Sequence, residues 1–216
     1  LILSDRYLDD LGEGIYDTLS AIAPVIAPKE IEVSDAYALQ QWEYEQLIYG
    51  HAIGKLDASK QAILDLRARA AAIKARLGDQ AGASVIAFRP RPEFAVIMSQ
   101  QWITGNMLTW SGLAGTEFTE SLAPPHSGNT VGIERLNLLD ADWLFVAARN
   151  QDMVAELEVY KQNPLFQTVP AYKSGQIALV SGDLWSGATG VLAGHAMLDD
   201  IERIIVDGDY IATPAA

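Results

Sequence analysis

The residues best suited to chemistry in this sequence lie between Pro125 and Asn150. His126 stands in a loop rich in glycine and asparagine, and Arg149 follows a run of apolar residues that is typical of a buried strand. Open α/β sheets collect ligand-binding groups at strand ends and in the loops beside them. A histidine and an arginine at such an edge suit a ligand that is both anionic and metal-bearing.

His126 follows Pro124 and Pro125, so we expect it to sit on a constrained and accessible loop. A neutral imidazole can ligate iron, and otherwise it offers stacking or hydrogen bonding. We expect His126 to line a ligand cleft. Direct ligation of a metal and a plain surface position are the alternatives.

Arginine suits an anionic ligand because its charge is permanent and its planar fork meets neighbouring oxygens together. For Arg149 the simpler alternative is a pair with a nearby carboxylate such as Asp152. Arg89 and Arg91 lie on a proline-stiffened turn between two predicted strands, so they are second candidates for the same role.

Among the tryptophans, Trp185 is the strongest candidate for ligand contact, because it follows a predicted strand and offers a large flat surface. Trp102 opens a predicted helix beside a strand and is a weaker candidate. Trp143 begins a predicted core strand, and packing is the simplest role for it and for Trp42 and Trp110.

Other chemistries have little support. The segment from Ser186 to Gly190 is glycine-rich, but it lacks the lysine of a P-loop and the spacing of a dinucleotide fingerprint. Capping of the last helix by Ser or Thr explains it adequately. His51 and His195 show no metal-ligand spacing, and no nucleophile and base are paired for hydrolysis.

Composition excludes several classes of protein. The 216 residues carry 15 Lys and Arg against 28 Asp and Glu, a net charge of −13, whereas nucleic acid selects basic surfaces. A small anion is not excluded, because exposed charges beyond about 8 Å are screened at physiological salt. The absence of cysteine excludes disulfides and thiolate metal sites, and no apolar run approaches the roughly 18 residues of a membrane span.

The helices and strands that must position these residues can be predicted from the pattern of apolar residues. Residues 1–4 are typical of a buried strand already under way, so we expect this sequence to be the later part of a longer protein. Residues 56–77 predict a long amphipathic helix closed by Gly78, because apolar residues recur at three- and four-residue steps. They are Ile63, Leu66, Ala70, Ile73 and Leu77.

Beyond Gly82 strands and helices alternate, which predicts an α/β lobe with a mostly parallel sheet covered on both faces. The predicted strands are residues 84–88, 94–98, 143–147 and 176–180, and the predicted helices are residues 103–113, 132–139, 151–160 and 189–206.

The order of these segments resembles the ferric-siderophore-binding proteins of ABC importers. The resemblance rests on an opening strand, the segment from Tyr16 to Pro24, the long helix, and Gly132–Leu136 placed before the strand at Asp142–Val146. These proteins belong to the helical-backbone class of periplasmic substrate-binding proteins, which also contains cobalamin binders. In that class one rigid helix joins two α/β lobes, and the ligand lies between the lobes.

The resemblance implies a division of this chain into three parts. Residues 1–57 would be the remainder of the amino-terminal lobe, residues 58–79 the linking helix, and residues 80–216 a complete carboxyl-terminal lobe.

The resemblance also implies roles for single residues. Arg149 matches an arginine that meets the anionic ferric complex, and His126 matches a cleft histidine that completes the iron shell in catecholate binders. Tyr7, with Arg6, follows the first strand where hydroxamate binders carry a ligand-contacting tyrosine. Glu134, in the first turn of a predicted helix, matches a glutamate that pairs with arginines of the permease.

We therefore expect a protein that captures a ferric siderophore, preferably a catecholate or mixed type, and delivers it to an ABC permease. It would be a monomer without enzymatic activity or a permanent cofactor, in the periplasm or lipid-anchored outside the cytoplasmic membrane. The alternatives are a cobalamin or haem binder of the same class, an α/β enzyme acting on a phosphorylated substrate at Ser186–Gly190, and a chain that only docks a partner.

Overall fold

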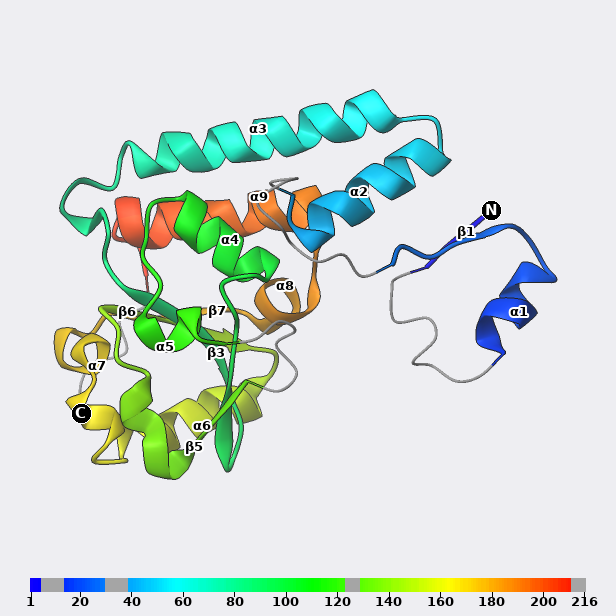
Figure 1. Ribbon diagram of the computed structural model, residues 1–216. Helices are drawn as coiled ribbons and strands as arrows, with labels where there is room; N and C mark the ends of the chain where they lie inside the picture. The colour runs from blue at the N-terminus through cyan, green and yellow to red at the C-terminus, as the bar shows by residue number, and fades with distance from the viewer. Residues whose placement is uncertain (5–13, 30–38, 123–128, 211–216) are drawn as a thin grey trace. The chain divides into compact units, whose positions relative to one another are not determined.

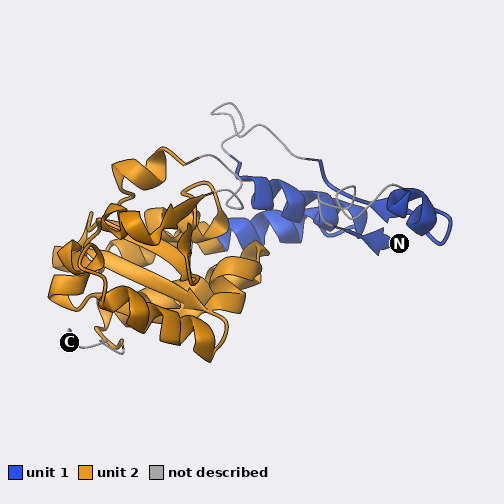
Figure 2. Cartoon of the chain, turned by 90° about the horizontal axis from the view of Figure 1, so that it is seen from below, with its two compact units in different colours: residues 1–65 blue, residues 66–216 orange. Residues whose placement is uncertain are grey.

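The computed structural model describes residues 1–4, 14–29, 39–122 and 129–210. The predictions for Arg6, Tyr7 and His126 lie outside the described residues. The chain divides into two compact units, residues 1–65 and residues 66–216 (Figure 2). The candidate site lies within the second unit.

The first unit holds a two-stranded parallel sheet and helical segments. Gln40 and Glu43 form a capping box at the start of α2, with the Gln40 N–H donating to Glu43 Oε2 at 2.9 Å. The Tyr49 hydroxyl donates to the Ser4 carbonyl at 2.7 Å, which fixes the segment after β1 against α2. The elements are β1 (Ile2–Leu3), α1 (Ile15–Ser20), β2 (Val25–Ile26) and α2 (Gln41–Ala52).

Helix α3 (Leu56–Lys74) confirms the long helix that the apolar spacing predicts, and the boundary between the two units falls within it. All five periodic apolar residues, Ile63, Leu66, Ala70, Ile73 and Leu77, are buried. Gly78 then adopts a φ of 56°, a left-handed conformation that glycine accepts at no steric cost.

The half of α3 in the second unit is fixed to the last helices of the chain, α9 (Gly190–Ile201) and the π-helical turn Glu202–Val206. Gly194 lets α9 approach closely, since a Cβ there would lie 2.6 Å from a methyl carbon of Leu66. Arg69 donates to the His195 carbonyl at 3.1 Å. Arg69 of α3 and Arg76, just after its end, are also ion-paired with carboxylates: Arg69 with Asp199 and Glu202, and Arg76 with Glu202 and Asp207.

The second unit is built on a five-stranded sheet in the order β5-β4-β3-β6-β7. Strands β3, β6 and β7 pair in parallel, whereas β4 is antiparallel to both β3 and β5. The α/β class is confirmed, but the sheet is mixed and not mostly parallel. The strands are β3 (Val85–Pro90), β4 (Phe94–Ile97), β5 (Thr130–Gly132), β6 (Trp143–Ala148) and β7 (Ile177–Ser181).

The reason for the mixed sheet is the short connection between β3 and β4. A parallel crossover needs a dozen or more residues, and residues 91–93 allow only a hairpin. The predicted helix at residues 132–139 is also shorter and irregular. Gly132 ends β5, and the 3₁₀ segment Ile133–Leu138 is interrupted at Arg135, whose φ of −134° is not helical.

Helices cover both faces of this sheet, with α4 and α9 on one side and α6 and α7 on the other (Figure 1). The core under α6 contains Phe88, Leu144, Val146, Leu157 and Tyr160, all at most 1% exposed. No helix in the described ranges is both long and apolar enough to cross a membrane. The helices are α4 (Ile103–Trp110), α5 (Glu117–Glu120), α6 (Gln151–Lys161), α7 (Pro170–Ser174) and α8 (Gly182–Gly187), with 3₁₀ turns at Gly78–Gln80 and Phe166–Thr168.

Candidate functional site

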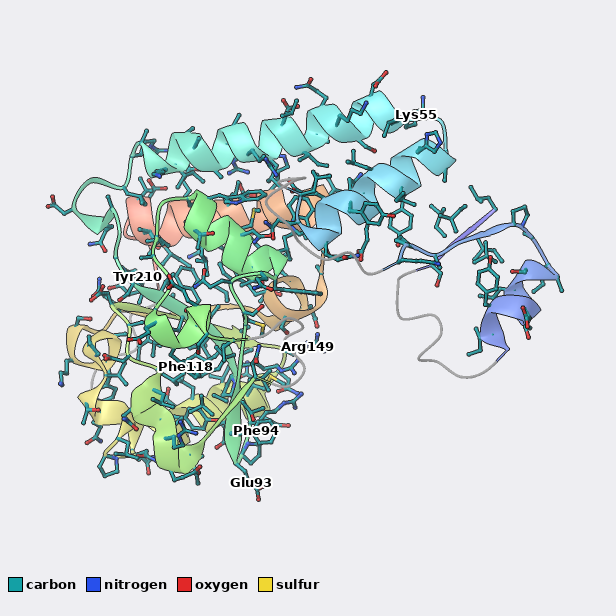
Figure 3. The ribbon with its side chains drawn as sticks, in the orientation of Figure 1. Lys55, Glu93, Phe94, Phe118, Arg149 and Tyr210 are labelled. Atoms are coloured by element: carbon teal, nitrogen blue, oxygen red, sulfur yellow. The ribbon has the colours of Figure 1, made fainter. Side chains whose placement is uncertain are left out.

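The structure brings three predicted arginines to one edge of the sheet. Arg89 lies near the carboxyl end of β3, Arg91 follows that strand, and Arg149 follows β6. Strands β3 and β6 are parallel neighbours with Phe88 opposite Val146, so their carboxyl ends meet at the same edge. Figure 3 shows Arg149 at this end of the strands.

Arg91 and Arg149 are both close enough to repel the guanidinium group of Arg89. Burial, and then the positive charges of Arg91 and Arg149, lower the pKa of the Arg89 guanidinium. The buried Nε of Arg89 has no hydrogen-bond partner within the described part of the chain. A bound anion would relieve this repulsion, because opposite charge favours the ionised form.

The backbone of Arg91 is held by Tyr160 of α6. The Tyr160 hydroxyl donates to the Arg91 carbonyl at 2.7 Å, and the Arg91 N–H donates back to that hydroxyl at 3.3 Å. The tyrosine ring is buried and stacks on Phe88 with centroids 6.3 Å apart. Burial raises the pKa of Tyr160 to about 12, so the hydroxyl keeps its proton and remains a donor at neutral pH.

Arg149 lies along the short helix α8. Its Nε and Nη2 face the carbonyls of Gly182 and Ser186 at 3.5 and 3.4 Å, which are long and therefore weak hydrogen bonds. Glycines make room for it: a Cβ at Gly182 would lie 2.6 Å from Arg149 Cγ, and one at Gly187 would lie 2.7 Å from Nη2. The ion pair of Arg149 is with Asp183 at 3.4 Å, not with the Asp152 that the sequence suggested.

The structure contradicts the prediction for Trp185. The sequence predicted a ligand-contacting ring, but the residue has no exposed surface. Its ring stacks on Phe145 with centroids 4.9 Å apart, and its Nε1 donates to Asp200 Oδ2 at 2.8 Å. Arg203 donates to the other oxygen of Asp200 at 2.8 Å. Trp185 therefore anchors α8 in the core and offers no ring face to a ligand.

The remaining tryptophans are distributed between the core and the domain surface. Trp42 and Trp143 are buried at 4% and 3%, which confirms their assignment to packing. Trp110 is half-buried under the guanidinium of Arg67, whose Cζ lies 4.9 Å from the ring centroid. Trp102 caps the start of α4 and is also half-buried, and a role in ligand binding stays a prediction.

Glu134 is exposed and is the second residue after the end of β5. Its carboxylate folds back over Gly132, where a Cβ would lie 2.6 Å from the carboxyl carbon. The neighbouring Ile133 is fixed at both ends of its peptide: its N–H donates to the Glu93 carbonyl at 3.2 Å, and its carbonyl accepts from Asn163 Nδ2 at 3.0 Å. The position of Glu134 on the surface is therefore well defined.

Two other kinds of site have no support within the described ranges. No group of three or more His, Asp or Glu side chains that could hold a metal ion is found there. The Ser186 hydroxyl is buried and donates to the Gly182 carbonyl at 2.6 Å, so it is part of α8 and not of a phosphate-binding loop. The sequence reasoning missed Asp183 and the two glycines at the ends of α8, although Gly182 and Gly187, five residues apart after a predicted strand, were a visible signal.

Comparison with known proteins identifies the family and several relatives of this chain. The periplasmic binding protein family profile matches residues 1–184. The chain is 28% identical over 198 residues to a probable siderophore-binding lipoprotein, YfiY, of Bacillus subtilis, covering 88% of this chain and 59% of that protein. It is 25% identical over 194 residues to the Fe(3+) dicitrate-binding periplasmic protein FecB of Escherichia coli, covering 88% and 60%. The chain thus spans about 60% of the length of these relatives.

The fold is shared with solved structures. The structure of Staphylococcus aureus SirA complexed with staphyloferrin B superimposes with a TM-score of 0.73 at 17% identity, covering 94% of this chain and 70% of that one. Members of this family bind their ligands and do not turn them over. Since the profile covers most of the sequence, this chain belongs to the periplasmic binding protein family.

Proposed function

We propose that this protein captures an anionic ferric siderophore and presents it to an ABC permease. The observation that carries the proposal is the cluster of Arg89, Arg91 and Arg149 at the carboxyl edge of β3 and β6, where burial and mutual repulsion lower the pKa of Arg89. Such a cluster suits a ligand with several negatively charged oxygens.

Charge-assisted hydrogen bonds account for the affinity. Each is worth about 1.5–3 kcal/mol, so two or three offset the ordering of a small ligand. The net charge of −13 does not oppose this, because distant exposed charges are screened and the arginines act at contact distance. The hard oxygen donors to iron come from the siderophore, and the protein recognises the outside of the complex.

The siderophore class follows from the same chemistry. A catecholate or mixed-type ferric complex is anionic, as is ferric citrate, which the name of FecB specifies for that relative. Beyond the arginines, we propose His126 near the iron, Tyr7 and Arg6 from the other part of the chain, and Trp102 as an aromatic contact. The relatives are named as a lipoprotein and a periplasmic protein, so we place this protein in the periplasm or anchored by lipid outside the cytoplasmic membrane.

Delivery requires a docking surface, and we propose Glu134 as part of it, pairing with an arginine of the permease. Its carboxylate is exposed and has no hydrogen bond or ion pair among the residues that the structure describes. We also propose that residues 1–57 complete one lobe of a two-lobed protein, with α3 as the link between lobes.

A titration of the full-length protein tests the proposal. Tryptophan fluorescence is followed during addition of ferric catecholate, ferric citrate, a neutral ferric hydroxamate and cobalamin. The iron-free form of each of the three iron chelators is the control. We expect saturable quenching by an anionic ferric complex and weaker binding at high salt. Tight binding of cobalamin, or of a neutral complex without dependence on salt, would contradict the proposal.

A further inference from the structure

Strands β4 and β5 of the same unit bring an exposed phenylalanine and an exposed glutamate close together on the surface. Phe94 of β4 and Gly132 of β5 are direct partners in an antiparallel pair. Partners of this kind point to the same face of a sheet, with Cβ atoms about 4.5–5.5 Å apart. The next pair, Ala95 and Val131, is buried in the core. The Phe94 side chain and the position that a Cβ of Gly132 would take therefore face away from that core.

Glu134 occupies the space that a side chain of Gly132 would fill. The chain turns at Ile133, and the Glu134 carboxylate folds back until its Cδ lies 2.6 Å from where a Gly132 Cβ would be. Because that Cβ position is the cross-strand neighbour of the Phe94 Cβ, the carboxylate lies next to Phe94 on the same face of the sheet.

Both groups are available to a partner. Phe94 is 38% exposed and Ile133 beside it is 41% exposed. Figure 3 shows Phe94 and Glu93 at the tip of the β3–β4 hairpin. Single exposed apolar residues are common and prove nothing. Here an exposed phenylalanine neighbours an exposed carboxylate that has no partner within the described ranges.

We propose that Phe94 and Glu134 together form a receptor for one arginine side chain of the permease. The carboxylate accepts the N–H edge of the guanidinium, and the ring packs against its face. Arginine fits better than lysine because a guanidinium is planar, donates in a fork and stacks on aromatic rings. This inference rests on the proposed function, which supplies the permease as partner and Glu134 as a docking residue.

Gly132 provides a variant that moves the carboxylate without removing it. Its backbone, at φ −64° and ψ 156°, is accessible to alanine, so the added methyl group displaces only the flexible Glu134 side chain. The other variants are Glu134→Gln, which removes the charge, and Phe94→Leu, which removes the ring but keeps an apolar side chain. Glu93→Gln and Tyr16→Leu serve as matched controls, an exposed acid at the same end and an exposed aromatic residue elsewhere.

The experiment measures docking of the siderophore-loaded, full-length protein on its permease in lipid nanodiscs, with the unfolding midpoint of each variant as a check on folding. We expect Gly132→Ala, Glu134→Gln and Phe94→Leu each to weaken docking by about fivefold or more, and both controls to match the wild type. Phe94→Tyr should retain docking. The double variant of Phe94 and Glu134 should lose less than the product of the two single losses, because both groups hold one guanidinium.

The outcomes separate the two proposals. If Glu134→Gln weakens docking but Phe94→Leu and Gly132→Ala do not, Glu134 docks alone and the receptor is refuted while the proposed function stands. Independent, multiplicative losses would also refute the receptor. If the wild-type protein binds its siderophore but does not dock at all, the proposed partner is wrong and the receptor falls with it.

Discussion

Arg149 and Asp183 form an ion pair, with the arginine Nε 3.4 Å from a carboxylate oxygen. The aspartate side chain is 85% exposed and that of the arginine 38%, so water screens the pair. Pairs of this kind contribute about 0–1 kcal/mol. Arg149 is thus positioned by α8 but only weakly neutralised, and Asp183 competes with any anion that approaches it.

Removing this competitor should strengthen ligand binding. We expect Asp183→Asn to raise the affinity for an anionic ferric complex by up to about fivefold, which corresponds to the worth of an exposed pair. The gain should shrink as salt is added. The measurement is the fluorescence titration, with Asp152→Asn as the control. Weaker binding by Asp183→Asn would show instead that Asp183 orients Arg149.

Removing Arg149 itself should have the opposite effect. Arg149→Ala should weaken binding of the anionic complex about tenfold, since one lost charge-assisted contact is worth about 1.4 kcal/mol or more. Lys173→Ala, which removes an exposed cation on α7, is the control for net charge. Equal affinities of the Arg149 variant and the wild type would exclude this residue from the site.

Trp185 should matter for stability and not for ligand contact. Trp185→Phe keeps an aromatic ring against Phe145 but removes the donor to Asp200, which then keeps only Arg203 as a partner within the described residues. We expect a loss of about 1–3 kcal/mol in the free energy of unfolding, measured in urea, with ferric-ligand affinity retained. Reduced affinity at unchanged stability would return Trp185 to the ligand site.

Tyr160 makes stability depend on alkaline pH. Its pKa is raised to about 12 in the folded protein and is about 10 when unfolded. A raised pKa contributes stability that is complete below pH 10 and is lost as the pH rises through 12. The wild type should therefore lose more stability between pH 10 and 12 than Tyr160→Phe, by at most about 2–3 kcal/mol.

Urea unfolding at a series of pH values checks this expectation, with Tyr172→Phe as the control for general alkaline effects. Parallel curves for the wild type and Tyr160→Phe would contradict it. At neutral pH the Tyr160 variant should be about 1 kcal/mol less stable, because the Arg91 carbonyl loses its donor.

The sequence was informative where a pattern is local. Periodic apolar residues located α3, and apolar runs located β3, β6 and β7, so the edge that collects Arg89 and Arg149 was predictable. Strand order was less accessible. Strand β5 has only Thr130–Gly132, too short for a periodic signal, and its pairing with β4 depends on partners distant in sequence.

The direction in which a side chain points was the other property that the sequence could not predict. A tryptophan after a strand gives the same signal whether it faces a ligand or the core, and only packing against Phe145 and Asp200 decides for Trp185. The partner of Arg149 was likewise unreachable from spacing. Asp152 is nearer in sequence, but α8 places Asp183 beside the guanidinium.

The ion pairs that Arg69 and Arg76 form with residues 199–207 affect how this unit folds during its synthesis. Arg69 and Arg76 are synthesised well before their partners Asp199, Glu202 and Asp207, because the paired residues lie 126 to 133 positions apart in the sequence. The apolar side of α3 therefore gains its cover from α9 only after the intervening sheet has been synthesised. A nascent chain stalled before Gly190 would thus expose this stripe to chaperones and proteases, and loss of α9 would be harmful although α9 carries none of the proposed ligand-contacting residues.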